Sequence, residues 1–353
     1  MIRVAFNGFF RGRLVGTGRY TDELLRALAS DVELCVVDPD RSGFGGEDLR
    51  KLWFEQVTVP RAARALGPDL VHYPYFAAPA RSPAPLVVTA HDVIPLVLPE
   101  YRGSPLVRMY MRLQTATVRR ARLILTDSNA SRHDVVRFLD VPRQRVRVIP
   151  LAADPSFTPA PPEEIEAVRR RLRLPERYVL YNGGLDVRKN VPRLILAYAR
   201  ARGSHGVVEP LVITGNPDQR GALFPPVRSL VEQLGLEKHV RFVGMARDEI
   251  RALYSGCALF VYPSRYEGFG LPVLEAMACG APVACSNASS VPEVAGDAAL
   301  LFDPDDEAQM AESIARGLAE PERGERGLAR AAEFSWEKTA TATLQAYRDA
   351  VAA

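Results

Sequence analysis

The sequence predicts an α/β protein built from two doubly wound parallel sheets. Short apolar runs alternate with amphipathic segments along the chain, and one proline-rich stretch interrupts the alternation. The length of 353 residues also exceeds what a single ordinary core accommodates. Alternation of this kind implies parallel strands joined by right-handed crossovers.

In the first half, apolar runs predict strands at residues 2–7, 32–38, 70–73, 86–90, 123–127 and 146–150. Helices are expected between them, most clearly at 19–29, 105–120 and 131–139. Leu24, Leu25 and Leu28 lie at helical spacing in the first of these helices.

A proline-rich stretch, residues 155–162, predicts an exposed linker because proline lacks a backbone donor and stiffens the chain. Strands are then expected at 178–182, 211–214, 240–243, 259–262, 283–285 and 300–302, with helices at 191–202, 227–234, 248–254, 271–279 and 306–319. We therefore expect Rossmann-like domains over residues 1–155 and 156–335. The amphipathic tail, 336–353, is expected to pack back on the first domain.

Composition excludes several classes of protein. The net charge of +3 gives no general case for nucleic-acid binding. No signal segment opens the sequence, and no run approaches the roughly 20 apolar residues of a membrane helix. Four cysteines without a C-x-x-C pair suggest buried free thiols, so we expect a cytoplasmic protein.

The segment Glu267-Gly-Phe-Gly-Leu-Pro-Val-Leu-Glu275 joins a predicted strand to a predicted helix. Amides at a helix N-terminus bind phosphate. Here they would come from Gly268, Phe269, Gly270 and Leu271. Glu267 would lie at the loop mouth near sugar hydroxyls, and Glu275, about two turns into the helix, could accept both ribose hydroxyls. The alternative is that both glutamates are only solvated.

Three further motifs follow predicted strands. Arg188 and Lys189 lead into a helix, and their charges suit a diphosphate leaving group, which gains negative charge as the sugar bond breaks. The alternative is a solvated basic turn. His91 can donate to a sugar hydroxyl or lie beside developing positive charge, or it is structural. Gly16 and Gly18 allow close backbone approach to a phosphate, or belong to an ordinary loop. No histidine spacing indicates a metal site.

Together these motifs resemble the retaining GT-B glycosyltransferases of the large family four, glycosyl transferases group 1. The matching motifs are E-x(7)-E at Glu267 and Glu275, R-K-N at 188–190, H-D-x-x-P at 91–95 and G-x-G-R-Y at 16–20. The extension to Pro99-Glu100-Tyr101 is similar to bacterial mannosyl- and rhamnosyltransferases of polysaccharide biosynthesis. The chain departs from the family pattern at Gly184, where many members have an arginine that grips the diphosphate.

The resemblance implies two domains facing a cleft and a metal-independent hexosyltransferase without a cofactor. Its donor would be a nucleotide diphosphate sugar on the second domain, GDP-mannose first, with UDP- and dTDP-sugars open. The acceptor would be a saccharide, a lipid-linked glycan or a small molecule, as in lipopolysaccharide synthesis. His91, Glu267 and Lys189 would lie at the reacting sugar, Arg188 and Lys189 at the diphosphate, Glu275 at the ribose, and Gly244 near the base.

Two other functions stay open at this stage: a sugar-nucleotide epimerase on the same fold, and a catalytically silent partner-binding module. Peripheral membrane contact is a further possibility. Arginines at 102, 108, 112, 119, 120 and 122 surround a helix that also has Leu106, Met109, Leu113 and Val118. The alternative is a solvated basic face.

Overall fold

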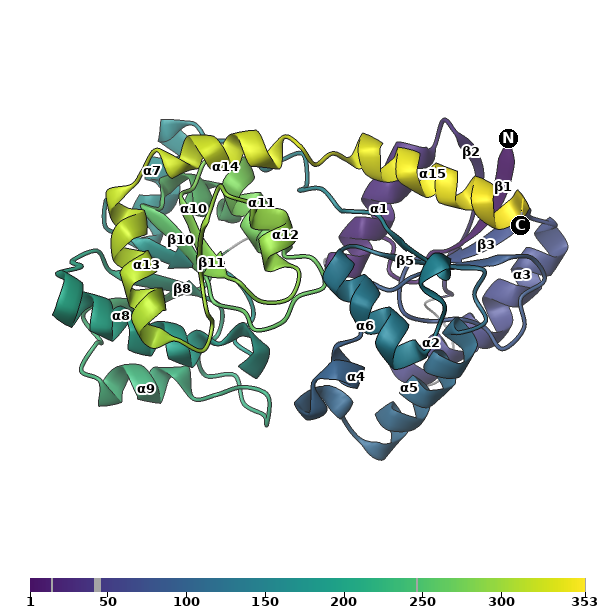
Figure 1. The fold of residues 1–353 in the computed structure, drawn as a ribbon, viewed down its shortest axis with the longest axis horizontal. Helices are drawn as coiled ribbons and strands as arrows, with labels where there is room; N and C mark the ends of the chain where they lie inside the picture. The colour runs from purple at the N-terminus through teal and green to yellow at the C-terminus, as the bar shows by residue number, and fades with distance from the viewer. Residues whose placement is uncertain (14, 41–45, 246, 353) are drawn as a thin grey trace. The chain divides into compact units, whose positions relative to one another are not determined.

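The computed structural model describes residues 1–13, 15–40, 46–245 and 247–352. The chain forms two compact units, Met1–Ala152 with Ser335–Ala353, and Ala153–Phe334. Each unit contains one six-stranded sheet whose paired strands are all parallel (Figure 1). The two doubly wound α/β sheets predicted from the sequence are therefore confirmed.

The first sheet has the strand order β2-β1-β3-β4-β5-β6. Its strands are β1 (Ile2–Asn7), β2 (Val32–Val37), β3 (Leu70–Tyr73), β4 (Leu86–Thr89), β5 (Leu123–Thr126) and β6 (Val146–Val148). The accompanying helices are α1 (Gly16–Leu28), α2 (Glu47–Trp53), η1 (Phe54–Thr58), α3 (Val59–Leu66), α4 (Ile94–Val97), η2 (Pro99–Arg102), α5 (Pro105–Val118), α6 (Asn129–Leu139) and η3 (Arg143–Arg145). The C-terminal helix α15 (Trp336–Ala352) packs beside α1, whereas α5 and α6 cover the opposite face of the sheet (Figure 1).

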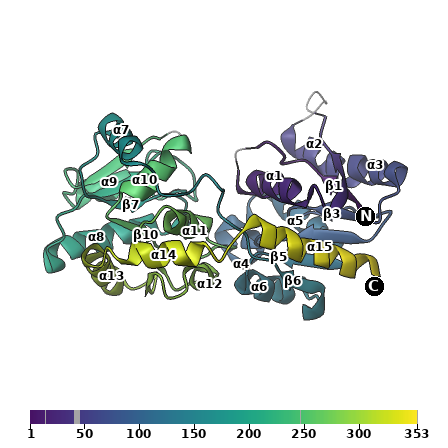
Figure 2. The same ribbon diagram turned by 90° about the horizontal axis from the view of Figure 1, so that it is seen from above.

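The second sheet has the order β12-β11-β10-β7-β8-β9. Its strands are β7 (Val179–Tyr181), β8 (Leu211–Thr214), β9 (Val240–Val243), β10 (Leu259–Tyr262), β11 (Val283–Ser286) and β12 (Leu300–Phe302). Its helices are α7 (Pro162–Leu172), η4 (Val187–Lys189), α8 (Val191–His205), α9 (Val227–Gln233), η5 (Arg247–Glu249), α10 (Ile250–Gly256), α11 (Leu271–Ala278), α12 (Val291–Ala295), α13 (Glu307–Ala319) and α14 (Arg323–Ala331). Figure 2 shows α8 beside α13 and α11 beside α14, two helix pairs that pack together.

The strand order reverses once in each sheet, at β1 in the first unit and at β7 in the second. Doubly wound sheets bind ligands beyond the carboxyl ends of their strands at such a reversal. The loops after β1, β3, β7 and β10 are therefore the places where the fold positions functional groups.

Several sequence expectations need correction. Helix α1 begins at Gly16, not at residue 19, and the helices at 47–66, 291–295 and 323–331 were not predicted. The expected exposed linker is partly buried, because Phe157 and Ala160 contribute to the core, and Pro162 already starts α7. The expectation of free thiols, in contrast, agrees with the structure: Cys257, Cys279 and Cys285 are buried and Cys35 is partly buried.

Helix α15 is joined to the first sheet by a buried polar chain. The hydroxyl of Tyr347 lies 2.6 Å from Nδ1 of His72, and Nε2 of His72 lies 2.9 Å from Oγ1 of Thr89. Burial lowers the pKa of His72 to about 3, so the ring is neutral and uses one nitrogen as donor and one as acceptor. Oγ1 of Thr339 also donates to the carbonyl of Pro150 at 2.7 Å. These bonds fix the helix on the sheet.

Replacing Tyr347 with phenylalanine should lower the free energy of unfolding of the first unit by about 1–3 kcal/mol, because a buried nitrogen of His72 loses its partner. Both tryptophans, Trp53 and Trp336, belong to this unit, so urea unfolding followed by tryptophan fluorescence reports on it. Thr341→Ala, on the exposed side of α15, is the control and should have little effect. An equal loss in both variants would contradict the role of the buried chain.

Candidate functional site

In the second unit, the loops after the neighbouring strands β7 and β10 are tied together. Asn190 precedes α8 in the left-handed conformation, with φ of 60°. Its Nδ2 donates to the carbonyl of Pro263 at 3.2 Å and to that of Pro304 at 2.7 Å. Asparagine tolerates this backbone conformation and supplies the donor, so Asn190 of the R-K-N motif has a structural role.

Glu267 lies at the centre of this region, with only 8% of its surface exposed. Its Oε1 accepts hydrogen bonds from Nζ of Lys189 at 2.6 Å, Oγ of Ser264 at 2.6 Å and the hydroxyl of Tyr262 at 2.8 Å. Its Oε2 accepts from a terminal nitrogen of Arg188 at 3.0 Å. A single buried carboxylate thus fixes both cations of the loop after β7.

The charges in this cluster stabilise one another. Burial raises the pKa of Glu267, but Lys189 and Arg188 lower it more, and the net value is about 2. Burial lowers the pKa of Lys189, and its ion pair with Glu267 offsets part of that effect. Asp186 lies 3.4 Å from Nε of Arg188 and faces the same guanidinium. Glu267 and Asp186 therefore balance the charges of Arg188 and Lys189, so the two cations stay in place without leaving net charge buried.

The structure modifies the expectation for Glu267. The sequence placed this carboxylate at the loop mouth, available to sugar hydroxyls. Instead its oxygens are engaged by four side chains of the second unit. Its direct contribution in this conformation is to orient Arg188 and Lys189.

The loop from 267 to 270 presents backbone amides at the N-terminus of α11. Gly270 has φ of 111°, a conformation that favours glycine. The carbonyls of Glu267 and Phe269 accept hydrogen bonds from Oγ of Ser290 at 2.9 and 2.8 Å, and Oγ of Ser289 donates to the former at 2.7 Å. These serines fix the loop by its carbonyls and leave the amide side open.

Within the described residues, the amides of Phe269, Gly270 and Leu271 have no hydrogen-bond acceptor. Gly270 is the N-cap and Leu271 the first residue of α11, where the helix has no internal acceptor for their amides, and Phe269 directly precedes them. Amides in this arrangement bind anionic groups, and phosphate above all. Together with Gly268, these are the four residues from which the sequence predicted phosphate contacts.

Glu275 lies in the second turn of α11 and is buried. The hydroxyl of Tyr254 is 3.5 Å from its Oε2, at the outer limit of a hydrogen bond. Nδ2 of Asn182 donates to that hydroxyl at 2.8 Å, and Oγ1 of Thr214 donates to Oδ1 of Asn182 at 2.8 Å. This chain joins Glu275 to the carboxyl ends of β7 and β8.

Gly184 leaves room beside the cation pair. A Cβ at this position would lie 2.9 Å from Oδ2 of Asp186, the far end of a flexible side chain. Its carbonyl accepts a hydrogen bond from the hydroxyl of Tyr181 at 2.5 Å. A Cβ at 184 therefore requires only a shift of the Asp186 side chain.

The predicted base region follows β9. Gly244 is exposed, and a Cβ there would meet no atom within 4 Å. The ring of Phe242 is covered by the guanidinium of Arg228, whose carbon lies 5.4 Å from the ring centroid. The face of Phe242 that Arg228 covers is thus already occupied.

In the first unit, His91 follows β4 and meets Asp127, which follows the neighbouring strand β5. Nδ1 of His91 lies 2.7 Å from Oδ2 of Asp127, and Nε2 lies 3.2 Å from the carbonyl of Pro74. Burial lowers the pKa of His91, but Asp127 raises it more, so the net pKa is above 6.5. Acceptors at both nitrogens fit a protonated ring.

The structure corrects the prediction of a glycine loop at Gly16 and Gly18, since both residues belong to α1. A Cβ on Gly18 would lie 2.2 Å from the carbonyl oxygen of Arg13 and 2.7 Å from that of Phe10. Gly18 is therefore needed for the preceding turn to pack on the helix. Gly16 is exposed, and a Cβ at that position would have no other atom within 4 Å.

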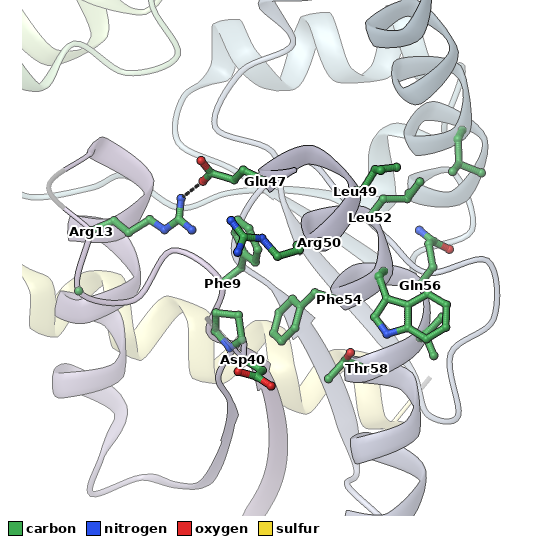
Figure 3. Close-up of a pocket in the computed structure, with 15 residues that line it drawn as sticks. Phe9, Arg13, Asp40, Glu47, Leu49, Arg50, Leu52, Phe54, Gln56 and Thr58 are labelled. Carbon is green, nitrogen blue, oxygen red and sulfur yellow. Dashed lines mark hydrogen bonds and ion pairs between the residues drawn. The ribbon is translucent and has the colours of Figure 1, made fainter. Parts of the chain in front are cut away.

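A cavity of about 1150 Å³ opens beside the loop after β1 in the first unit. Phe9 and Phe54 contribute apolar surface, and Arg13, Arg50 and Asp40 contribute charge (Figure 3). Arg13 forms an ion pair with Glu47, and its guanidinium carbon lies 4.6 Å from the centroid of Phe9. Apolar rings with a few charged groups suit a carbohydrate or another polar organic ligand.

Two kinds of feature are absent from the described part of the chain. No group of three or more His, Cys, Asp or Glu side chains there is arranged to hold a metal ion. No helix there is long and apolar enough to cross a membrane.

Asp127 and Asn182 were not predicted as site residues, although their positions in the sequence indicate such a role. Asp127 and Asn182 are polar residues directly after apolar strands, which is where this fold places ligands. Ser264, Ser289 and Ser290 had no such signal, because their role depends on the approach of loops distant in sequence.

Known families match both units. Residues 15–157 match Glycosyltransferase Family 4, and residues 163–333 match Glycosyl transferases group 1. The chain is 38% identical to the O-antigen chain mannosyltransferase B of Escherichia coli, over 79% of this chain and 74% of that protein. It is 32% identical to the serotype-specific mannosyltransferase WbdA of Escherichia coli over 74% of this chain, but spans only 33% of WbdA.

Solved structures share the fold at low sequence identity. The sucrose-phosphate synthase of Thermosynechococcus elongatus superposes with a TM-score of 0.74 at 23% identity, covering 99% of both chains. Anabaena Alr3699/HepE, solved with UDP and glucose, superposes with a TM-score of 0.73 at 18% identity, covering 99% of this chain and 100% of that one. The fold is that of the GT-B glycosyltransferases. The chain belongs to the glycosyl transferases group 1 family and is a glycosyltransferase.

The buried carboxylate gives a pH-dependent prediction. The pKa of Glu267 falls from 4.5 to about 2 on folding, so its stabilisation is complete above pH 4.5 and is lost as the pH falls toward 2. A shift of this size corresponds to about 3 kcal/mol. Glu267→Gln should lack that dependence, and at pH 7 it should be about 3–5 kcal/mol less stable because two cations lose their anion.

Hydrogen exchange of peptides from β7 and β10, measured at pH 7, 5 and 3, reports on the second unit alone. Glu237→Gln, at an exposed carboxylate of the same unit, is the control for the loss of one charge. The same pH dependence in Glu267→Gln and in the unmodified chain would contradict the assigned charge network.

Proposed function

We propose that the protein is a retaining, metal-independent hexosyltransferase that takes mannose or a similar sugar from a nucleotide diphosphate sugar in glycan biosynthesis. One observation carries this proposal. The cations of Arg188 and Lys189, the open amides of Phe269, Gly270 and Leu271, and the carboxylate of Glu275 come from loops and a helix at one edge of the sheet. The names of the mannosyltransferase relatives support mannose as the first sugar to test.

A nucleoside diphosphate fits these groups in order. The amides at the start of α11 suit phosphate oxygens, and the cations suit the charge that grows on the diphosphate as the sugar bond breaks. Glu275, about one turn further along α11, is then the group for the ribose hydroxyls. Because protein cations supply the positive charge, we propose that the reaction needs neither a metal nor another cofactor.

The transfer step follows from this arrangement. The bond between the anomeric carbon and the phosphate oxygen breaks, and the diphosphate leaves with the electron pair. The acceptor hydroxyl attacks from the face that the diphosphate leaves, and its proton passes to a phosphate oxygen. The new bond keeps the configuration of the old one. The protein contributes mainly by positioning groups and stabilising charge.

Glu267 has a positioning role in this scheme, since its oxygens hold the cations. His91 has a role toward the donor sugar only if a sugar oxygen replaces the carbonyl of Pro74, its weaker partner at 3.2 Å. The protonated ring would then donate a charged hydrogen bond.

The acceptor side is assigned to the first unit. The cavity beside Phe9 and Phe54 has rings and charged groups that suit a saccharide acceptor (Figure 3). We also propose a cytoplasmic protein with peripheral membrane contact for a lipid-linked acceptor. Leu106 and Met109, 73% and 64% exposed on α5, supply apolar surface for that contact.

Incubation with GDP-mannose and other sugar nucleotides, with EDTA and with saccharide acceptors, tests the function. Release of nucleoside diphosphate and a glycosylated product with the donor's anomeric configuration, both read by NMR, is the expected result. Turnover that stops with EDTA would contradict the metal-independent mechanism. An epimer formed from the donor alone would favour the epimerase, and no reaction of any donor would favour a silent module.

Steady-state kinetics separate the roles of two residues. Glu275→Ala should raise the donor KM more than it lowers kcat, because it removes a contact to the ribose, which does not react. Lys189→Ala should lower kcat, because it removes charge stabilisation on the leaving diphosphate. The opposite pattern would contradict both assignments.

Gly184 gives a prediction of increased affinity. Gly184→Arg should bind nucleoside diphosphate more tightly than the unmodified chain, because it adds a cation beside Arg188 and Lys189. Gly184→Ala makes the same Cβ contact with Asp186 without the charge and is the matched control. Calorimetry measures both affinities. If the affinity for nucleoside diphosphate fell in Gly184→Arg and stayed the same in Gly184→Ala, the prediction would be wrong, and the glycine would be needed for reasons other than space.

A further inference from the structure

A second groove of the first unit, on the outer helices rather than at the strand ends, gathers positive charge. It has a volume of about 480 Å³ and lies among α4, η2, α5 and α6. Four arginines line it: Arg102, Arg108, Arg112 and Arg119. No carboxylate is among its lining residues. The transferase assignment uses none of these side chains.

The guanidinium groups in this groove are only partly neutralised. Arg119 forms an ion pair with Asp140 at 3.0 Å, and Arg108 donates to the carbonyl of Gly103 at 3.0 Å. Arg102 and Arg112 have no hydrogen bond or ion pair within the described residues. Cations gathered around one groove without counter-charges repel one another and favour the binding of an anion.

A buried hydroxyl gives independent support. Oγ1 of Thr115 is buried and has no hydrogen-bond partner within the described residues. Thr117, two residues further along α5, donates to the carbonyl of Leu113 at 3.0 Å. Thr115 does not make this common bond within a helix, and it lines the groove. Buried polar groups without a partner are rare, and rotation of this side chain toward the groove would let a ligand oxygen satisfy the hydroxyl.

The rest of the lining restricts the chemistry of the ligand. Leu96, Met111 and Phe138 provide apolar surface beside the arginines. Guanidinium groups prefer phosphate because its oxygens accept paired hydrogen bonds. A solvated basic face, the alternative from the sequence, does not account for an enclosed hydroxyl or for the apolar lining.

We infer that this groove is a second anion site, which binds a phosphate or diphosphate group through Arg102, Arg112 and the hydroxyl of Thr115. The apolar surface takes a hydrocarbon part of the same ligand. The site is separate from the anion site at α11, and the inference does not depend on transfer activity. A phospholipid headgroup and a free phosphate ester share this chemistry.

Site-resolved chemical modification tests the inference on the full chain. Phenylglyoxal modifies exposed guanidinium groups, and peptide mass spectrometry gives the rate at each arginine. The probes are inorganic pyrophosphate, and vesicles of phosphatidylcholine with or without phosphatidylglycerol. Arg61 and Arg64 on α3 are exposed arginines of the same unit and serve as internal references.

The expected result is several-fold slower modification of Arg102 and Arg112 with at least one anionic probe, while Arg61 and Arg64 change little. Protection by pyrophosphate identifies a free phosphate ester as the source, and protection only by vesicles with phosphatidylglycerol identifies a lipid headgroup. No protection by any probe, or equal protection of all four arginines, would overturn the inference.

Variants provide the second measurement. Arg112→Gln should reduce the protection of Arg102, whereas Arg64→Gln removes the same charge on α3 and should not. Thr115→Val removes the buried hydroxyl and should weaken protection without lowering the Tm. Equal effects of Arg112→Gln and Arg64→Gln would show only a general charge effect and would overturn the site.

Discussion

The candidate site of the second unit depends on one buried ion cluster, the carboxylate of Glu267 between Lys189 and Arg188. Without that anion, two cations at the edge of a parallel sheet would repel each other in a poorly solvated place. With it they stay charged and fixed in position, and the loops after β7 and β10 are held together. The opposing charges also explain why the pKa of Glu267 is low although burial alone would raise it.

The backbone of the loop before α11 provides the second part of the candidate site. Gly270 adopts a conformation that favours glycine, and Ser289 and Ser290 bind the carbonyls of the same loop. Within the described residues, the amides of Phe269, Gly270 and Leu271 find no acceptor in this loop, and an anion can satisfy them. Glu275 follows about one helical turn after the first residue of α11. Charge, amides and a carboxylate are thus ordered along one edge by the fold.

Much of this could be predicted from the sequence. The strands were found because parallel strands read as apolar runs, and the motifs were found because ligands bind where such strands end. Other features could not be found this way. The start of α1 at Gly16 and the engagement of Glu267 by four side chains depend on contacts between distant segments. The close approach of the Arg13 and Phe10 carbonyls to Gly18 is another contact that the glycine pattern does not reveal.

The proposed function requires that the second unit bind a nucleoside diphosphate with its own cations and amides. Calorimetric titration of the full chain with GDP, UDP, ADP and dTDP, in the presence of EDTA, tests it most directly. Selective binding of one nucleotide, and weaker binding of that nucleotide by Lys189→Ala, is the expected result. Absence of binding by all four, or binding only after a divalent metal is added, would contradict it.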